Sequence, residues 1–344
     1  AAAMLVPNSL ALLNHAYPDA KARGRAVGVW AAGASLALTA GPLAGGVLIA
    51  LTGWRAIFLV NVPIGLVGLW LTWRFADETP RAKARRLDLP GQATAILALG
   101  ILAGAIIEGG VLGWRNGFVL GGVAASAILA MLFVLRERSA EQPMLPLQLF
   151  RRRSFALAAL VGVLVNIAFY GLIFVLSLYF QRLDGLSPLQ TGLAFTPMLG
   201  VVLPVNLIAA RLSERWGAPL TIAAGALIAS AGALGLLIVQ GQTPYVMLCA
   251  QLMALGGGLG LLVPPMTSML LGSVDKQYSG IASGVLNSAR QTGSVVGVAL
   301  FGALVAEGAS FGEGLRLSLA IAAGLLIASA AVVTLGRGAK ERYR

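Results

Sequence analysis

One charged side chain interrupts a long apolar stretch near the end of the sequence. Arg290 lies about ten residues into the stretch 279–305, with Asn287 three residues before it and Gln291 directly after it. In a helix these side chains lie on adjoining faces, roughly 15 Å along the axis from the start of the stretch. Because an ionisable group is costly inside a membrane, we predict that the three residues face a central cavity or bind its partner in a conformational change. The alternative is that Arg290 snorkels toward the membrane surface, or hydrogen-bonds backbone carbonyls and braces its own helix.

Two uncharged polar residues inside other apolar stretches, Asn166 and Gln251, are further candidates for the wall of a cavity. The alternative for each is a hydrogen bond between packed helices. The sequence has one cysteine and one histidine, so a single chain cannot assemble a disulfide framework, a Cys/His zinc site or a Cys–His catalytic pair. The apolar stretches hold no metal-ligand cluster or nucleophile–base pair. We therefore expect no metal, no cofactor and no enzymatic activity.

The elements that carry these residues are predicted to be transmembrane helices. The 344 residues are 58% hydrophobic and 11% charged, whereas soluble domains carry roughly 25% charged residues. The apolar residues come in repeated blocks of about 20, the helix length that crosses a hydrocarbon core of roughly 30 Å. The predicted fold class is all-α, a polytopic transmembrane helical bundle. The net charge of +12 does not indicate nucleic-acid binding, because Lys and Arg lie in short loops rather than on one face of a folded domain.

The apolar blocks predict one partial span, ending near Leu13, and ten complete spans. The complete spans run approximately over 26–51, 55–75, 89–108, 117–135, 154–180, 188–210, 218–239, 243–271, 279–305 and 314–336. One set of alternate loops holds 20 of the 25 Lys and Arg residues, the other set holds four, and Arg290 lies inside a span. Since basic loops stay on the cytoplasmic side, we predict a multi-pass protein of a bacterial cytoplasmic (inner) membrane with its C-terminus in the cytoplasm.

Two longer charged loops, 76–90 and 136–153, divide the chain into three parts. They predict a remainder of an N-terminal bundle at 1–75, a central two-helix insert with its flanking loops at 76–153, and a complete six-helix bundle with a basic tail at 154–344. Only two complete spans and a fraction precede the insert. We therefore expect that about three spans are absent from the front of this sequence.

Glycines lie mostly inside the predicted spans, and several form small-x3-small pairs. These pairs are Gly41/Gly45, Gly256/Gly260, Gly280/Gly284 and Gly293/Gly297. Because the hydrophobic effect does not drive helix against helix in lipid, such pairs favour close packing of backbones. Pro42 follows Gly41 in the middle of a span and predicts a kink, either structural or part of a gate.

The stretch from Gly28 to Gly46 resembles the antiporter motif on the fifth helix of major-facilitator antiporters. The matching positions are Gly28, Ala37, Gly41, Pro42, Gly45 and Gly46, with Ala37 where the family usually has Gly. The next stretch, WRAIFLVNVPIG (54–65), resembles the following helix of the fourteen-span drug:proton antiporters of QacA/EmrB type. Further segments, at 1–13, 142–155, 185–197 and 280–297, are similar to that family as well. By this likeness the sequence starts within the fourth helix.

A cytoplasmic loop, AARLSERWGAP (209–219), resembles the second copy of the loop motif of the same family. The positions carried over are Glu214, Arg215 and Gly217, with Glu214 in place of the usual Asp. The closing basic pair of the motif is replaced by Ala218 and Pro219. This departure puts a gating role for Glu214 and Arg215 in question.

The resemblance implies a two-bundle transporter that exports drugs or other small molecules by alternating access, driven by the proton motive force. Its partners would be a small-molecule substrate, protons and the lipid bilayer, and it would be a monomer when full length. The family's proton carriers are usually carboxylates in the membrane, one on the first helix, and no deep carboxylate is evident here. We therefore expect that these 344 residues alone do not transport. The alternatives are a metabolite uptake carrier and a non-transporting membrane remnant or scaffold.

Overall fold

The computed structural model describes residues 43–75, 88–139, 145, 147–238, 244–274, 278–306 and 310–341, together with isolated positions between 9 and 41. Within these ranges, nine helices are long and apolar enough to cross a membrane, and a shorter apolar helix, Leu43–Thr52, precedes them. The partial span predicted to end near Leu13, and most of the span predicted at 26–51, lie outside the described residues.

The described helices follow one another with short connections. Their bounds are α3 (Ala56–Leu59), α4 (Asn61–Phe75), α5 (Leu89–Leu112), α6 (Gly117–Ser139), η1 (Leu147–Arg151), α7 (Arg153–Arg182), α8 (Pro188–Ala194), α9 (Thr196–Gly200), α10 (Val202–Trp216), α11 (Ala218–Gly235), η2 (Leu236–Ile238), α12 (Tyr245–Gly272), α13 (Ser279–Ala306) and α14 (Phe311–Glu341). Each complete span predicted from residue 55 onward coincides with one of these helices or a short series of them. The all-α membrane fold is confirmed.

The segment predicted as one span at 188–210 differs from the prediction in two ways. It consists of three consecutive helices, α8, α9 and α10, because Pro197 and Pro204 cannot donate backbone hydrogen bonds to the preceding turns. It also continues to Trp216, six residues beyond the predicted end. There Gly217, at φ +81°, terminates α10 and donates its N–H to the carbonyl of Ser213 at 3.0 Å. At the opposite end, a capping box forms between Ser187 and Gln190.

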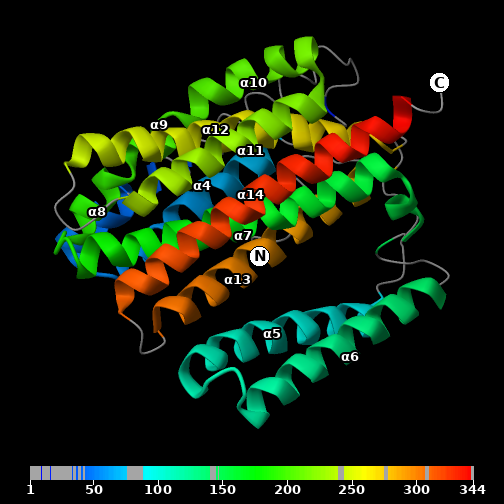
Figure 1. The fold of residues 1–344 in the computed structure, drawn as a ribbon, viewed down its shortest axis with the longest axis horizontal. Helices are drawn as coiled ribbons and strands as arrows, with labels where there is room; N and C mark the ends of the chain where they lie inside the picture. Colours follow the sequence, from blue (N-terminus) through cyan, green and yellow to red (C-terminus); the bar gives the residue numbers. More distant parts are fainter. Residues whose placement is uncertain are drawn as a thin grey trace.

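The long helices run side by side (Figure 1). Most buried side chains belong to α7, α11, α12, α13 and α14. In this group α11 packs along α12, while α7 packs along α13 and α14. The largest fully buried side chains include Phe155, Phe180 and Phe301. These helices hold the hydrophobic core of the described molecule.

Small residues bring the paired helices of this bundle together. A Cβ built on Gly293 would lie 2.5 Å from the carbonyl oxygen of Val163, and one on Gly297 would lie 2.8 Å from the Cα of Ile167. Gly256 and Gly260 on α12 meet the backbone of Met198 and Val202 in the same way. The small-x3-small prediction is therefore confirmed for these two pairs. The pairs Gly41/Gly45 and Gly280/Gly284 have no described atom within 4 Å of a built Cβ.

Helices α5 and α6 form a hairpin that lies beside α13, apart from the other long helices (Figure 1). Asp88 caps α5 by accepting a hydrogen bond from the N–H of Gly91, and it pairs with Arg136 of α6 at 3.4 Å. Near the middle of the hairpin, the buried hydroxyl of Ser126 donates to the carbonyl of Ala98 at 2.8 Å. Polar interactions therefore join α5 and α6 at two places along the hairpin.

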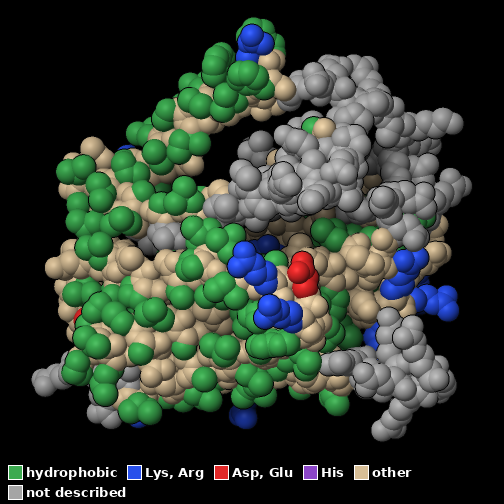
Figure 2. Space-filling view, turned by 90° about the horizontal axis from the view of Figure 1, so that it is seen from above, with side chains coloured by type: hydrophobic (Ala, Val, Ile, Leu, Met, Phe, Trp, Pro, Cys, Tyr) green, Lys and Arg blue, Asp and Glu red, His purple; other side chains and the backbone are tan. Residues whose placement is uncertain are grey.

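The outer surface of the described molecule is apolar, as a bilayer requires. Helix α4 has no buried residue and exposes large side chains such as Trp70 and Trp73. Figure 2 shows hydrophobic side chains spread over one face, with charged side chains only as isolated groups. Since lipid tails are as apolar as these side chains, this exposure carries no penalty in the membrane.

Candidate functional site

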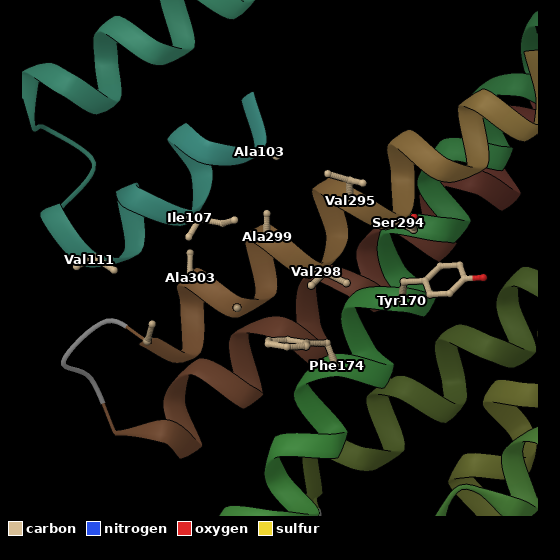
Figure 3. A pocket seen from close by; sticks show the side chains of 12 residues that line it. Ala103, Ile107, Val111, Tyr170, Phe174, Ser294, Val295, Val298, Ala299 and Ala303 are labelled. Carbon is tan, nitrogen blue, oxygen red and sulfur yellow. The ribbon is translucent and has the colours of Figure 1, made fainter. Parts of the chain in front are cut away.

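A groove of about 620 Å³ lies between the hairpin and the main bundle (Figure 3). One wall is α5, the other is α13, and α7 closes the floor. Its lining is almost wholly aliphatic and aromatic: Ala103, Ile107 and Val111 from α5, Tyr170 and Phe174 from α7, and Ser294, Val295, Val298, Ala299, Gly302, Ala303 and Ala306 from α13. Two of these residues, Tyr170 and Ser294, carry a hydroxyl group. Figure 3 shows both at the end of the groove opposite Val111.

The groove narrows at the end where α5 and α13 touch. A Cβ built on Gly110 of α5 would lie 2.7 Å from the Cα of Ala303. The floor is held against α13 by aromatic contacts, because a Cβ on Gly302 would lie 3.2 Å from the ring of Phe174. The groove is thus a wedge that is tight near the ends of α5 and α13 and wider toward their middle.

The three residues predicted from α13 lie one to two turns below this groove. Asn287 and Arg290 are half-buried, and Gln291 is exposed. The Cγ atom of Arg290 lies 4.0 Å from a Cβ built on Gly162 of α7, so the arginine stem rests on the α7–α13 seam. Within the described residues, the Arg290 guanidinium has no hydrogen bond or ion pair. Bracing of α13 by bonds from Arg290 to backbone carbonyls is therefore not observed among those residues.

Asn166 lies on the same seam and Gln251 does not. The amide of Asn166 is buried and donates to the carbonyl of Gly162 at 2.7 Å, next to the stem of Arg290. Gln251 packs from α12 against Gly235 of α11, and its carbonyl lies 2.7 Å from a Cβ built on Gly232. The structure therefore brings Asn166 together with the α13 residues and places Gln251 between α11 and α12.

The glycines of the antiporter-type stretch are partly described. Gly28 and Pro42 lie outside the described residues, while Ala37, Gly41, Gly45 and Gly46 are helical. Gly46 is buried against the start of α8, where a built Cβ would lie 2.7 Å from the Cα of Leu189 and 2.9 Å from the carbonyl oxygen of Pro188. This helix therefore touches the start of α8 through a residue without a side chain.

The loop-motif residues lie at the far end of α10. Glu214 and Arg215 are exposed in its last turn, and Gly217 supplies the positive φ that ends the helix. An arginine in a last turn interacts favourably with the helix dipole. None of the three approaches the groove.

One carboxyl group outside the membrane-spanning segments has a shifted pKa. Asp184 follows α7, where burial raises its pKa above the ordinary 3.8 and a hydrogen bond with Tyr179 opposes the rise. The group is thus shifted toward its neutral form.

The sequence prediction missed Tyr170, Phe174 and the wall contributed by α5. A signal for part of this site was present, because Ser294, Val298 and Gly302 continue at intervals of four residues from Arg290. Such a row forms one ridge on a helix. The contribution of α5 had no comparable signal, since its lining residues are alanine, isoleucine and valine.

The described part of the chain combines membrane-length helices, a packed bundle and an attached hairpin with an apolar groove between them. These features define a polytopic membrane protein. The sequence profile of the Major Facilitator Superfamily matches residues 1–94 and 91–298. The chain belongs to that family.

Relatives with assigned names extend this comparison. The chain is 37% identical to the methylenomycin A resistance protein of Streptomyces coelicolor over 325 residues, which are 94% of this chain and 68% of the relative. It is 37% identical to the protein of the same name from Bacillus subtilis, covering 88% of this chain and 65% of the relative. It is 36% identical to the multidrug resistance protein Stp of Mycobacterium tuberculosis, covering 89% of this chain and 57% of the relative. The chain thus spans between 57% and 68% of the length of these relatives.

Proposed function

We propose that this chain forms part of an exporter that moves drugs or other small molecules out across the cell membrane. The observation that carries the proposal is the extended similarity to resistance proteins, at 37% identity over 94% of the chain. The groove supports it, because a drug-sized site is typically a cleft of about 300–1,000 Å³ with mostly apolar walls and few polar groups.

The proposed mechanism is alternating access driven by proton influx, with two bundles that rock about a site near the middle of the membrane. Residues 1–75 belong to the first bundle, 76–153 are a two-helix insert and 154–344 are the second bundle, as in a fourteen-span transporter. The separate hairpin of α5 and α6 supports this division. So does the contact of Gly46 with the start of α8, where the two bundles would touch.

In this mechanism Arg290, Asn287 and Gln291 contribute the polar part of the substrate site, and Asn166 positions them through the α7–α13 seam. Gln251 acts in packing rather than in substrate contact, because it lies against Gly235. The close helix contact at Gly46 lets the bundles slide past one another. Glu214 and Arg215 act at the cytoplasmic end, where their exposure allows them to meet another loop during the cycle.

The basic loops and the C-terminus lie in the cytoplasm, and the protein functions as a monomer without a cofactor or an enzymatic step. The distribution of Lys and Arg between alternate loops supports this orientation. Cysteine labelling at Arg182 and at Arg215, from outside intact cells, tests it. Reaction at position 182 and protection at position 215 are expected, and the reverse pattern would contradict the orientation.

Transport is tested with the complete gene product that contains these residues, expressed in a bacterial strain without its own multidrug exporters. We expect raised resistance to at least one drug, and proton-dependent accumulation of that drug in everted vesicles. Arg290→Gln should abolish both, while Arg182→Gln, which changes an exposed arginine at the end of α7, should abolish neither. Accumulation in right-side-out vesicles instead would indicate uptake, and no movement in either direction would contradict a transporter.

A further inference from the structure

The groove and the polar residues of α13 form one continuous surface. Arg290 begins a row at intervals of four residues, and the later members Ser294, Val298, Gly302 and Ala306 all line the groove. Gln291 begins the neighbouring row, which continues through three further lining residues, Val295, Ala299 and Ala303. Successive side chains in such a row are neighbours on the helix surface, and the row winds gradually around the helix. The surface is therefore polar at one end and apolar along the remainder of its length.

Two polar groups at this end lack partners in the part of the chain that the structure describes. Neither the guanidinium of Arg290 nor the hydroxyl of Tyr170 has a hydrogen bond there, although the ring of Tyr170 packs against Phe169. Polar groups at membrane depth are stabilised by pairing or by an aqueous or ligand contact. A ligand that carries hydrogen-bond acceptor groups would supply such partners.

The charge at the polar end is positive. The lining contains no acidic residue, and Glu108 of α5 lies next to the lining residue Ile107 without being part of the lining. An Arg guanidinium offers several donors in a fixed geometry that suits a carboxylate or another acidic group. The head that fits this end is therefore anionic rather than cationic.

The dimensions fit one elongated molecule. From Arg290 to Ala303 the helix rises roughly 20 Å, and the groove alongside it has a volume of about 620 Å³. The tight contact of Gly110 with Ala303 closes the end nearer the membrane surface. A phospholipid fits poorly, because its head would have to lie at Arg290, roughly 15 Å along the helix from the start of the span and far from the interface.

We propose that the surface formed by Arg290, Tyr170 and the groove binds an amphipathic acid, with its acidic head at the arginine and its apolar body along α13. That this ligand is also the exported cargo rests on the proposed function, whereas its binding does not. The site selects for a negative head and an unbranched or flat apolar body, and it selects against cationic amphiphiles.

The test is equilibrium binding to the complete gene product that contains these residues, in lipid nanodiscs with no ion gradient. Dansylaminoundecanoic acid is the fluorescent probe, and dodecanoate, dodecanol and dodecylammonium are competitors with the same chain length and different heads. We expect dodecanoate to displace the probe best. Arg290→Gln should weaken binding of dodecanoate by roughly one to two orders of magnitude, the range expected for loss of a hydrogen bond to a charged group, and should leave dodecanol unchanged.

A second variant tests the groove independently of the arginine. Val295→Trp adds bulk at an exposed lining position and should weaken binding of all three competitors. Val123→Trp is the control, because Val123 is similarly exposed on α6, at 41% against 47%, and lines no part of the groove. Retained thermal stability of each variant shows that it is folded.

Two outcomes would overturn the proposal. Equal displacement by the three competitors, unaffected by Arg290→Gln, would mean that the groove holds only a lipid chain. Loss of binding in Val123→Trp as well as in Val295→Trp would mean that the probe partitions elsewhere. Because the assay has no gradient, binding without export in the vesicle experiment would refute the proposed function alone.

Discussion

Substitution of Gly297 by alanine tests whether the α7–α13 seam is as tight as the structure indicates. The added Cβ would lie 2.8 Å from the Cα of Ile167 and 3.0 Å from its carbonyl carbon. Carbon atoms in favourable contact are about 3.5–4.0 Å apart, so the two helices must separate locally by roughly 1 Å. Neither of these atoms can rotate away, because both belong to the backbone of α7.

The expected loss of stability is the difference of two effects. Overpacking a tight interior contact costs about 1–3 kcal/mol, while alanine in place of glycine inside a helix gains about 0.5–1 kcal/mol. The net destabilisation is therefore about 1 kcal/mol, the difference between the midpoints of those ranges. Gly284→Ala on the same helix is the matched control. It meets no described atom within 4 Å, so only the gain of about 0.5–1 kcal/mol remains.

The assay is unfolding of the two variants and the parent in mixed micelles by titration with sodium dodecyl sulfate, followed by circular dichroism. The midpoint should fall for Gly297→Ala and rise or stay unchanged for Gly284→Ala. If both variants shifted in the same direction by the same amount, the contact with Ile167 would not limit the approach of the helices. The inference of a close-packed α7–α13 seam would then be wrong.

Three further predictions concern other contacts. Asp184→Asn should make stability less dependent on pH. Because the pKa of Asp184 is raised above 3.8 in the folded state, the folded state binds more protons than the unfolded state, and the parent loses stability as the pH rises through that window. In thermal melts at increasing pH, the stability of the variant should therefore rise relative to that of the parent. Ser230→Ala removes a buried hydrogen bond from α11 to α14 and should lower stability by about 0.6 kcal/mol, the average for such bonds in a membrane. Ser329→Ala, which loses a bond within its own helix, should lower it less in the same titration. Asp88→Ala should destabilise the hairpin by about 1 kcal/mol through loss of the cap, measured by hydrogen exchange in α5, while Arg136→Ala should cost less because the ion pair is exposed.

Much of the fold was predictable because apolar blocks of membrane length have few alternatives to a helix. The breaks in the segment 188–216 were not predicted, although Pro197 and Pro204 are visible in the sequence. A proline inside a span marks a possible kink, as Pro264 and Pro265 do within the continuous helix α12. Whether the helix breaks depends on neighbours that supply or withhold partners for the freed carbonyl groups.

The glycine pairs likewise show that sequence spacing alone does not predict which helices pack closely. Gly280/Gly284 and Gly293/Gly297 have the same spacing on one helix, yet only the second pair meets a neighbouring backbone within the described residues. The spacing makes close approach of two helices possible, and the tertiary arrangement determines which pair makes the contact. Polar residues behave similarly. Gln251 lies in an interface with α11, and nothing local to its sequence distinguishes it from Asn166.

Sequence patterns single out the polar end of the candidate site and not its apolar end. Arg290 stands out because charge is rare inside a span. The walls of the groove are built from residues that are also suitable for a surface facing lipid, and α5 and α13 are separated by more than 160 residues of sequence. Their contact depends on where the hairpin docks, which no short-range pattern encodes.

The contact of Gly110 with Ala303 makes the width of the groove a property of a residue that is not part of its lining. A larger side chain at position 110 would displace α5 from α13 and widen the groove, although every lining residue would be unchanged. Relatives could therefore differ in the size of molecule they accept through this one position. Comparisons restricted to residues that touch the ligand would fail to find the cause.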